Sequence, residues 1–147
     1  MERLPYIDQH SRIVAADRAQ TWAALLRAVC KRPDDHASSS IQQDWSRASE
    51  WLVMPQGFVL EEADPPKRLA AKGEHWFSRY GIVFTLDEAD STHTRLTIDS
   101  YGAFPGIHGR VYRALVVGSG GHRVIVREML RRMASQAEKA AAMERRS

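Results

Sequence analysis

Apolar and polar positions alternate most regularly between Lys67 and Phe104. Interpreted as strands, this stretch predicts a hairpin that turns at Ser78-Arg79 and a third strand after Thr94. The predicted inward pairs are Phe77 with Tyr80, His75 with Ile82, Gly73 with Phe84 and Ala71 with Leu86. In the third strand Leu96, Ile98 and Ser100 share that face. Because the same face is apolar in all three strands, the pattern favours a curved antiparallel sheet over an apolar interior.

The first third of the chain predicts a strand followed by two helices. In the strand, Tyr6 to Ala15, alternation places Asp8, His10, Arg12 and Val14 on one face. Asp17 and Gln20 form a capping-box pattern, and apolar residues then recur at helical spacing, which predicts a helix over 18–30. A second, short helix is expected from Ser40 to about Met54. A strand over 57–63 and a turn at Asp64-Pro65-Pro66 lead into the hairpin.

The last third predicts a long amphipathic helix from Gly121 onward. Its apolar stripe consists of Val126, Met129, Leu130, Met133, Ala137 and Ala140. The opposite face is basic, with Glu128 one turn before Arg132 and so placed to pair with it. The segment Ile107 to Gly121, between the last strand and this helix, is interpreted as a short helix with a glycine hinge.

Length and charge narrow the class of protein. The 147 residues predict one α+β domain spanning 1–147. With 21 basic and 18 acidic residues the net charge is +3, a mixed surface that gives no argument for nucleic-acid binding. Cys30 is the only cysteine, which excludes an internal disulfide. The N-terminus has no signal-peptide pattern, and no apolar run approaches the ~18 residues of a membrane span. We therefore expect a cytoplasmic protein without stable membrane insertion.

Two stretches resemble a known superfamily. Residues 12–26, Arg-Ile-Val-Ala-Ala-Asp-Arg-Ala-Gln-Thr-Trp-Ala-Ala-Leu-Leu, are similar to the opening of the START-like, birch-pollen-allergen-like and polyketide-cyclase superfamily, SRPBCC. The pattern from Phe104-Pro-Gly to Met129-Leu130 is similar to a bacterial branch of it. This resemblance implies the helix-grip fold, in which a curved antiparallel sheet wraps around a long C-terminal helix. It also implies a cavity between the two that accepts lipids, sterols, polyketides and similar apolar molecules.

The inward face supplies the candidate ligand-binding residues. They are His75, Phe77, Tyr80, Ile82, Phe84, Ile98, Ser100, Met129 and Met133. His75 is an ionisable ring on an apolar face, where it could orient a polar ligand group or transfer a proton. A core histidine bonded to a neighbouring group remains the alternative. Small residues such as Ser100 and Gly102 leave volume for a ligand, although a closely packed helix needs them as well.

Three functions are compatible with this pattern. The first is binding of an apolar small molecule, oriented by His75, Tyr80 and Ser100. The second is an aromatase/cyclase-like enzyme that uses the same pocket, with His75 as proton carrier. The third is an interaction protein that uses Trp76 and the basic face of the last helix. No metal is expected, since the six histidines show no ligand spacing. No cofactor is expected either, because Arg123 replaces the third glycine of a dinucleotide fingerprint. A homodimer is left open.

Overall fold

The computed structural model describes most of the chain. It covers residues 4–29, 54, 57–75, 78–103, 106, 110, 111, 113, 114 and 120–146, with the backbone alone at 75, 78 and 122. Every structural statement below refers to these residues.

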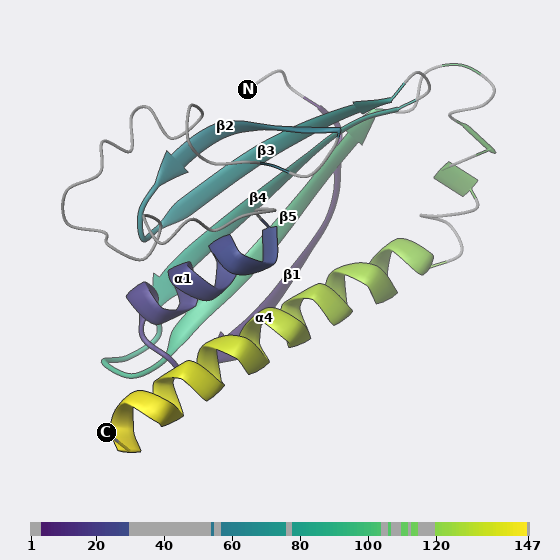
Figure 1. Ribbon diagram of the computed structural model, residues 1–147. Coiled ribbons are helices and arrows are strands. Elements are labelled where there is room, and N and C mark those ends of the chain that lie inside the picture. Colours follow the sequence, from purple (N-terminus) through teal and green to yellow (C-terminus); the bar gives the residue numbers. More distant parts are fainter. Residues whose placement is uncertain are drawn as a thin grey trace.

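A five-stranded antiparallel sheet and two helices make up the described fold (Figure 1). The strands are β1 (Tyr6–Val14), β2 (Phe58–Asp64), β3 (Arg68–His75), β4 (Ser78–Glu88) and β5 (Thr94–Ala103). The helices are α1 (Arg18–Val29) and α4 (Gly121–Arg146). The strand order is β1-β5-β4-β3-β2, so β1 and β2 form the two edges of the sheet. This confirms the expected α+β class and the long C-terminal helix.

The central hairpin has a different register from the predicted one. β3 and β4 pair from His75 opposite Ser78, so Gly73 faces Tyr80 and Ala71 faces Ile82. The predicted turn at Ser78-Arg79 is wrong, because Ser78 and Arg79 belong to β4, and the predicted partners are wrong by four residues. The error is an even number, however, and side chains alternate with a period of two. Every described residue of the hairpin therefore keeps its predicted face although its partner changes.

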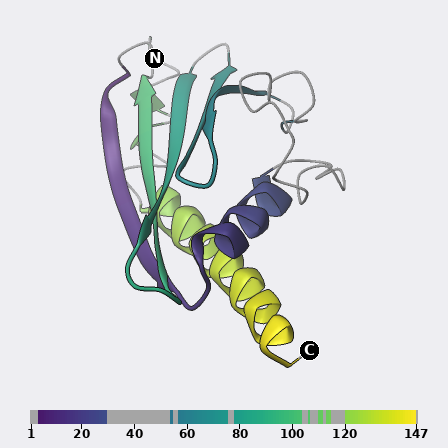
Figure 2. The same ribbon diagram turned by 90° about the vertical axis from the view of Figure 1, so that its left-hand side faces the viewer.

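Both helices pack on one face of the sheet, here called the concave face (Figure 2). α4 contacts α1, β1 and β5, while α1 contacts β4 and β5. Leu25 and Leu26 of α1 and Met133 of α4 are almost fully buried in the resulting core. The helices thus lie mainly over the β1-β5-β4 side of the sheet. None of the described helices is long and apolar enough to cross a membrane.

Local interactions explain where α1 begins, and ion pairs link side chains on the surface of α4. The Asp17 carboxylate accepts a hydrogen bond from the Gln20 backbone N–H at 2.8 Å, and the Gln20 side chain accepts one from the Asp17 N–H at 3.0 Å. This confirms the predicted capping box, which satisfies two donors at the start of α1. On α4, Glu128 pairs with Arg132 at 3.0 Å, as predicted, and also with Arg131 at 2.8 Å.

Several expectations fall outside the described residues. The predicted second helix, from Ser40 to about Met54, lies outside the described residues except at Met54, which is not helical, and Cys30, Trp76, Phe77 and Phe104 also lie outside them. Within 107–121 the described positions 110, 111, 113 and 114 are helical. Gly120, with φ of +81°, precedes α4 in a backbone conformation that favours glycine.

Candidate functional site

One end of the concave face is filled with large apolar side chains. Here Phe84 lies between Leu69 and Ile98, its partners on the two neighbouring strands. Leu86 and Leu96 form the next pair. All five are at most 1% exposed and belong to the core beneath α1 and α4. We call this the packed end.

The other end of the same face is built from small residues and two aromatic rings. Gly73 pairs with Phe58 on β2 and with Tyr80 on β4, and Tyr80 pairs in turn with Gly102 on β5. The Phe58 and Tyr80 rings meet edge to face, with centroids 5.1 Å apart. A Cβ added to Gly73 would lie 2.2 Å from Tyr80 Cε2 and 2.9 Å from the Gly57 carbonyl oxygen. Gly73 therefore provides the space in which the Tyr80 ring lies. We call this region the small-residue end.

Ser100 lies in the next row of the small-residue end, opposite Ile82 on β4 and Asp8 on β1. Its side chain is 3% exposed, and its Oγ has no hydrogen-bond partner among the described residues. Thr94, at the far end of the same strand, is equally buried, but its hydroxyl donates to the Ala16 carbonyl at 2.8 Å. Burying a hydroxyl without a partner costs free energy. Among the described residues, Ser100 therefore carries a buried hydroxyl whose burial no hydrogen bond compensates.

The β1 edge adds a polar pair to this region. Asp8 and His10 are on the concave face, opposite Ser100 and Ile98. The Asp8 carboxylate and His10 Nε2 are 3.1 Å apart, and both side chains are less than one fifth exposed. Ionisable groups in this position could contact a polar group bound next to Ser100.

The predicted site residues divide between the two ends. Phe84 and Ile98 lie at the packed end, and Met133 is in the core beneath it with 1% exposure. Ile82 and Met129 are partly buried and pack against that core from its margin. Tyr80 and Ser100 lie at the small-residue end. His75 ends β3 two residues beyond Gly73 on the same face, without a described side chain, and Phe77 is outside the described residues.

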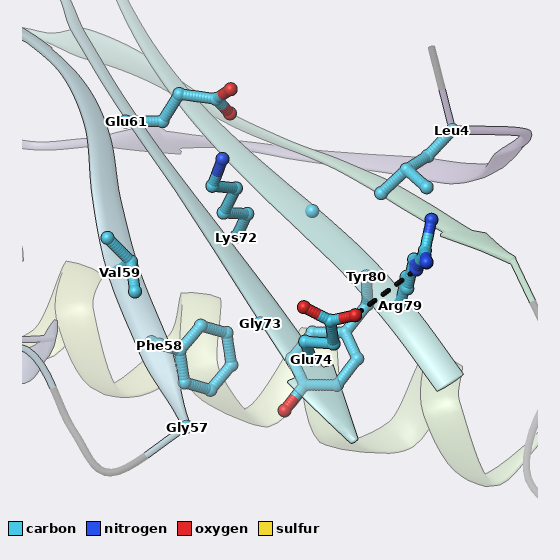
Figure 3. Close-up of a pocket in the computed structure, with 11 residues that line it drawn as sticks. Leu4, Gly57, Phe58, Val59, Glu61, Lys72, Gly73, Glu74, Arg79 and Tyr80 are labelled. Atoms are coloured by element: carbon cyan, nitrogen blue, oxygen red, sulfur yellow. Dashed lines mark ion pairs between the residues drawn. The ribbon is translucent and has the colours of Figure 1, made fainter. Parts of the chain in front are cut away.

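The opposite, convex face of the small-residue end carries a pocket of about 320 Å³ (Figure 3). In the close-up, α4 runs behind the sheet, and Leu4, Val59, Glu61 and Lys72 project on the near side. Arg79 and Glu74, which both line the pocket, form an ion pair of 3.3 Å. The pocket also reaches Phe58, Gly73, Tyr80 and Gly81. At the small-residue end, the convex face thus has an open pocket, whereas the Phe58 and Tyr80 rings cover Gly73 on the concave face.

The solved structures that are similar to this fold share little sequence identity with the chain. The sequence matches no family model and no curated protein at a significant level. The crystal structure of the Zhui aromatase/cyclase from Streptomyces sp. R1128 has 14% identity over 93% of this chain and 95% of its own, with a TM-score of 0.55. The chain has the helix-grip fold. TTHA0849 from Thermus thermophilus (14% identity, 93% and 99% coverage, TM-score 0.56) is similar over the same extent.

A third structure, a conserved protein from Geobacillus kaustophilus, has 13% identity over 92% of this chain and 94% of its own, with a TM-score of 0.51. The resemblance inferred from the sequence is therefore confirmed as a likeness of fold. At such identities the likeness carries no information about activity, since one fold serves many functions.

Sequence reasoning missed Phe58, Asp8 and His10 as members of this region. Phe58 meets Tyr80 only because β2 pairs with β3, and a register shift between Leu60 and Glu62 interrupts that pairing. Alternation gives Asp8 and His10 the same face of the first strand, but only the pairing of β1 with β5 shows that this face is the concave one. Among the described residues, no group of three His, Cys, Asp or Glu side chains could hold a metal ion.

Proposed function

We propose that the protein binds an apolar small molecule carrying one hydrogen-bonding group, and that this molecule lies over the small-residue end of the concave face. The Ser100 hydroxyl is the observation on which the proposal rests. It is buried and has no partner among the described residues, whereas the comparable Thr94 hydroxyl is bonded. A ligand oxygen or nitrogen next to Ser100 would remove the cost of burying that hydroxyl.

The side chains around Ser100 offer apolar surface that an apolar ligand could contact. Tyr80 and Phe58 offer aromatic surface, and Ile82 and Met129 offer partly buried aliphatic surface at the margin of the core. Burial of such surface contributes about 25 cal/mol per Å². The Asp8 and His10 pair and the Tyr80 hydroxyl are the polar groups nearest in register to Ser100. They support a ligand with a polar group at one end.

The distribution of helix contacts also supports this position. α1 and α4 contact β1, β4 and β5, and the small residues Ala71 and Gly73 lie on the neighbouring strand β3. His75, two residues beyond Gly73, would then be near the ligand, in the role of orienting its polar group.

Native mass spectrometry of the protein purified from its own host tests the proposal. We expect an added mass with a stoichiometry of one per chain, which extraction identifies as an apolar compound bearing a hydroxyl, carbonyl or carboxyl group. A clean protein mass, together with no saturable uptake of an added fluorescent fatty acid, would contradict the proposal.

A further inference from the structure

The outer edge of β1 borders a groove. β1 forms one edge of the sheet, and no described residue pairs with its outer side. A groove of about 440 Å³ runs between this edge and α4, lined by Ser11, Arg12, Val124, Arg127, Glu128, Leu130 and Arg131. Ile13 on β1 is 45% exposed, and Val124 and Ile125 on α4 are 68% and 61% exposed. An unpaired edge next to exposed apolar side chains is a site for strand addition.

The arginine side chains of the groove favour a partner strand that carries a carboxylate. Arg131 donates two hydrogen bonds to Glu128, and Arg132 donates one to the same carboxylate. Arg12 and Arg127 have no ion-pair partner among the described residues. The added strand should therefore place a carboxylate opposite Arg12.

The sequence of β1 supplies that carboxylate itself. In an antiparallel pair of two β1 strands related by a two-fold axis at His10, Asp8 faces Arg12 of the second copy, and Gln9 faces Ser11 of the second copy. Ile13 then faces Ile7 of the second copy, next to the register shift of β1. His10 is the midpoint of β1, so this register pairs the whole strand.

Neighbouring registers of the two β1 strands have less favourable charge pairing. Only shifts by two residues keep the concave faces on the same side. Moving the axis to Ser11 places Asp8 opposite Val14 and His10 opposite Arg12. Moving it to Gln9 places Tyr6 opposite Arg12 and leaves Val14 unpaired. Both lose the pairs between Asp8 and Arg12.

We propose that two copies of this chain associate through β1, across a two-fold axis at His10, to form a continuous ten-stranded sheet. Two pairs of Asp8 with Arg12 select the register, and the interface is isologous, as in most homodimers. The exposed apolar side chains at the N-terminal end of α4 lie beside the added strand. Asp8 and His10 belong both to this edge and to the small-residue end, so the test measures the oligomeric state and not ligand binding.

Charge reversal tests the proposal with the full-length protein. Light scattering during gel filtration should give a dimer for the wild type. Asp8→Arg places arginine opposite arginine twice per dimer, and Arg12→Asp places aspartate opposite aspartate. Each single variant should weaken dimerisation about tenfold or more, because like charges directly opposite are destabilising. The control is Lys72→Asp, which makes the same charge change as Arg12→Asp at an exposed position of β3. It should leave the dimer intact.

Mixing the Asp8→Arg and Arg12→Asp variants then tests whether these two positions face each other in the dimer. Asp8→Arg on one copy and Arg12→Asp on the other restore two unlike pairs, so the mixture should form a heterodimer, which native mass spectrometry recognises by its mass. This recovery also demonstrates that both variants fold. A monomeric wild type, a dimer that neither reversal weakens, or a mixture that stays monomeric would overturn the proposal.

Discussion

The two ends of the concave face are made by the same strands but have opposite packing. At the packed end, Phe84 and its neighbours are almost fully buried, and the Thr94 hydroxyl is bonded to a carbonyl. At the small-residue end, glycines replace large side chains, Ile82 is only partly buried, and the Ser100 hydroxyl has no described partner. The comparison separates two roles within one sheet. The packed end stabilises the fold, and the small-residue end is where we propose that a ligand binds.

Truncation of large side chains should reveal this difference most strongly. Phe84→Ala removes a fully buried ring and should lower the free energy of unfolding by about 3–5 kcal/mol. Ile82→Ala, on the same strand and face but only partly buried, should cost about 1–2 kcal/mol. Urea denaturation of both variants measures the two values. Equal losses would mean that the two ends are packed alike.

Added bulk at Gly73 should disturb the aromatic pair. In Gly73→Ala the new Cβ would overlap the Tyr80 ring, so the ring must move, at a cost of about 1–3 kcal/mol. Gly81→Ala is a suitable control, because a Cβ there has no neighbour nearer than 3.6 Å and belongs to the convex face. Near-ultraviolet circular dichroism should report a changed tyrosine environment in the first variant alone. An unchanged spectrum and stability for Gly73→Ala would refute the described position of Tyr80.

The two buried hydroxyls should respond in opposite ways to removal. Thr94→Val leaves the Ala16 carbonyl without its donor and should cost about 1–3 kcal/mol. Ser100→Ala removes an unpartnered hydroxyl, so the ligand-free protein should be unchanged or more stable by up to about 1 kcal/mol. Thermal unfolding gives both numbers. A clear loss for Ser100→Ala would indicate that the hydroxyl already has a structural partner.

The turn that closes the packed end should have a measurable acid dependence. Hydrogen bonds to the Asp90 carboxylate, first from the Thr92 backbone N–H and then from the His93 side chain, lower its pKa from the ordinary 3.8 to about 2. Because the folded pKa is depressed, the stabilisation is present above the ordinary pKa and is lost as the pH falls from about 4 to 2. Carbon-detected NMR titration of Asp90 checks this, and a midpoint near 3.8 would contradict it.

The sequence was sufficient for the faces of the strands but not for their partners. Alternation fixed the inward side of Ile82, Phe84 and Ile98, since it depends only on each strand's own period of two. The hairpin register depends on which two residues form the turn, and the pattern assigned that turn to Ser78-Arg79 although His75 pairs with Ser78.

The same distinction between faces and partners applies to the residues of the candidate site. Ser100 could be predicted because it lies on a strand with a clear alternation. The meeting of Phe58 with Tyr80 could not, because it requires the long-range pairing of β2 with β3 and a bulge within it. Likewise, the concave position of His10 follows only from the pairing of β1 with the distant strand β5.

The central claim is that a ligand occupies the concave side of the small-residue end, and a pair of tryptophan substitutions tests it most directly. Ile82→Trp adds bulk on the concave face, whereas Val59→Trp adds the same group on the convex face, where Val59 is 58% exposed. In titrations with a fluorescent fatty acid, the wild type and Val59→Trp should bind one molecule per chain, and Ile82→Trp should bind about tenfold more weakly or not at all. Unimpaired binding by Ile82→Trp, with loss of binding in Val59→Trp, would contradict the claim and assign the ligand to the convex pocket.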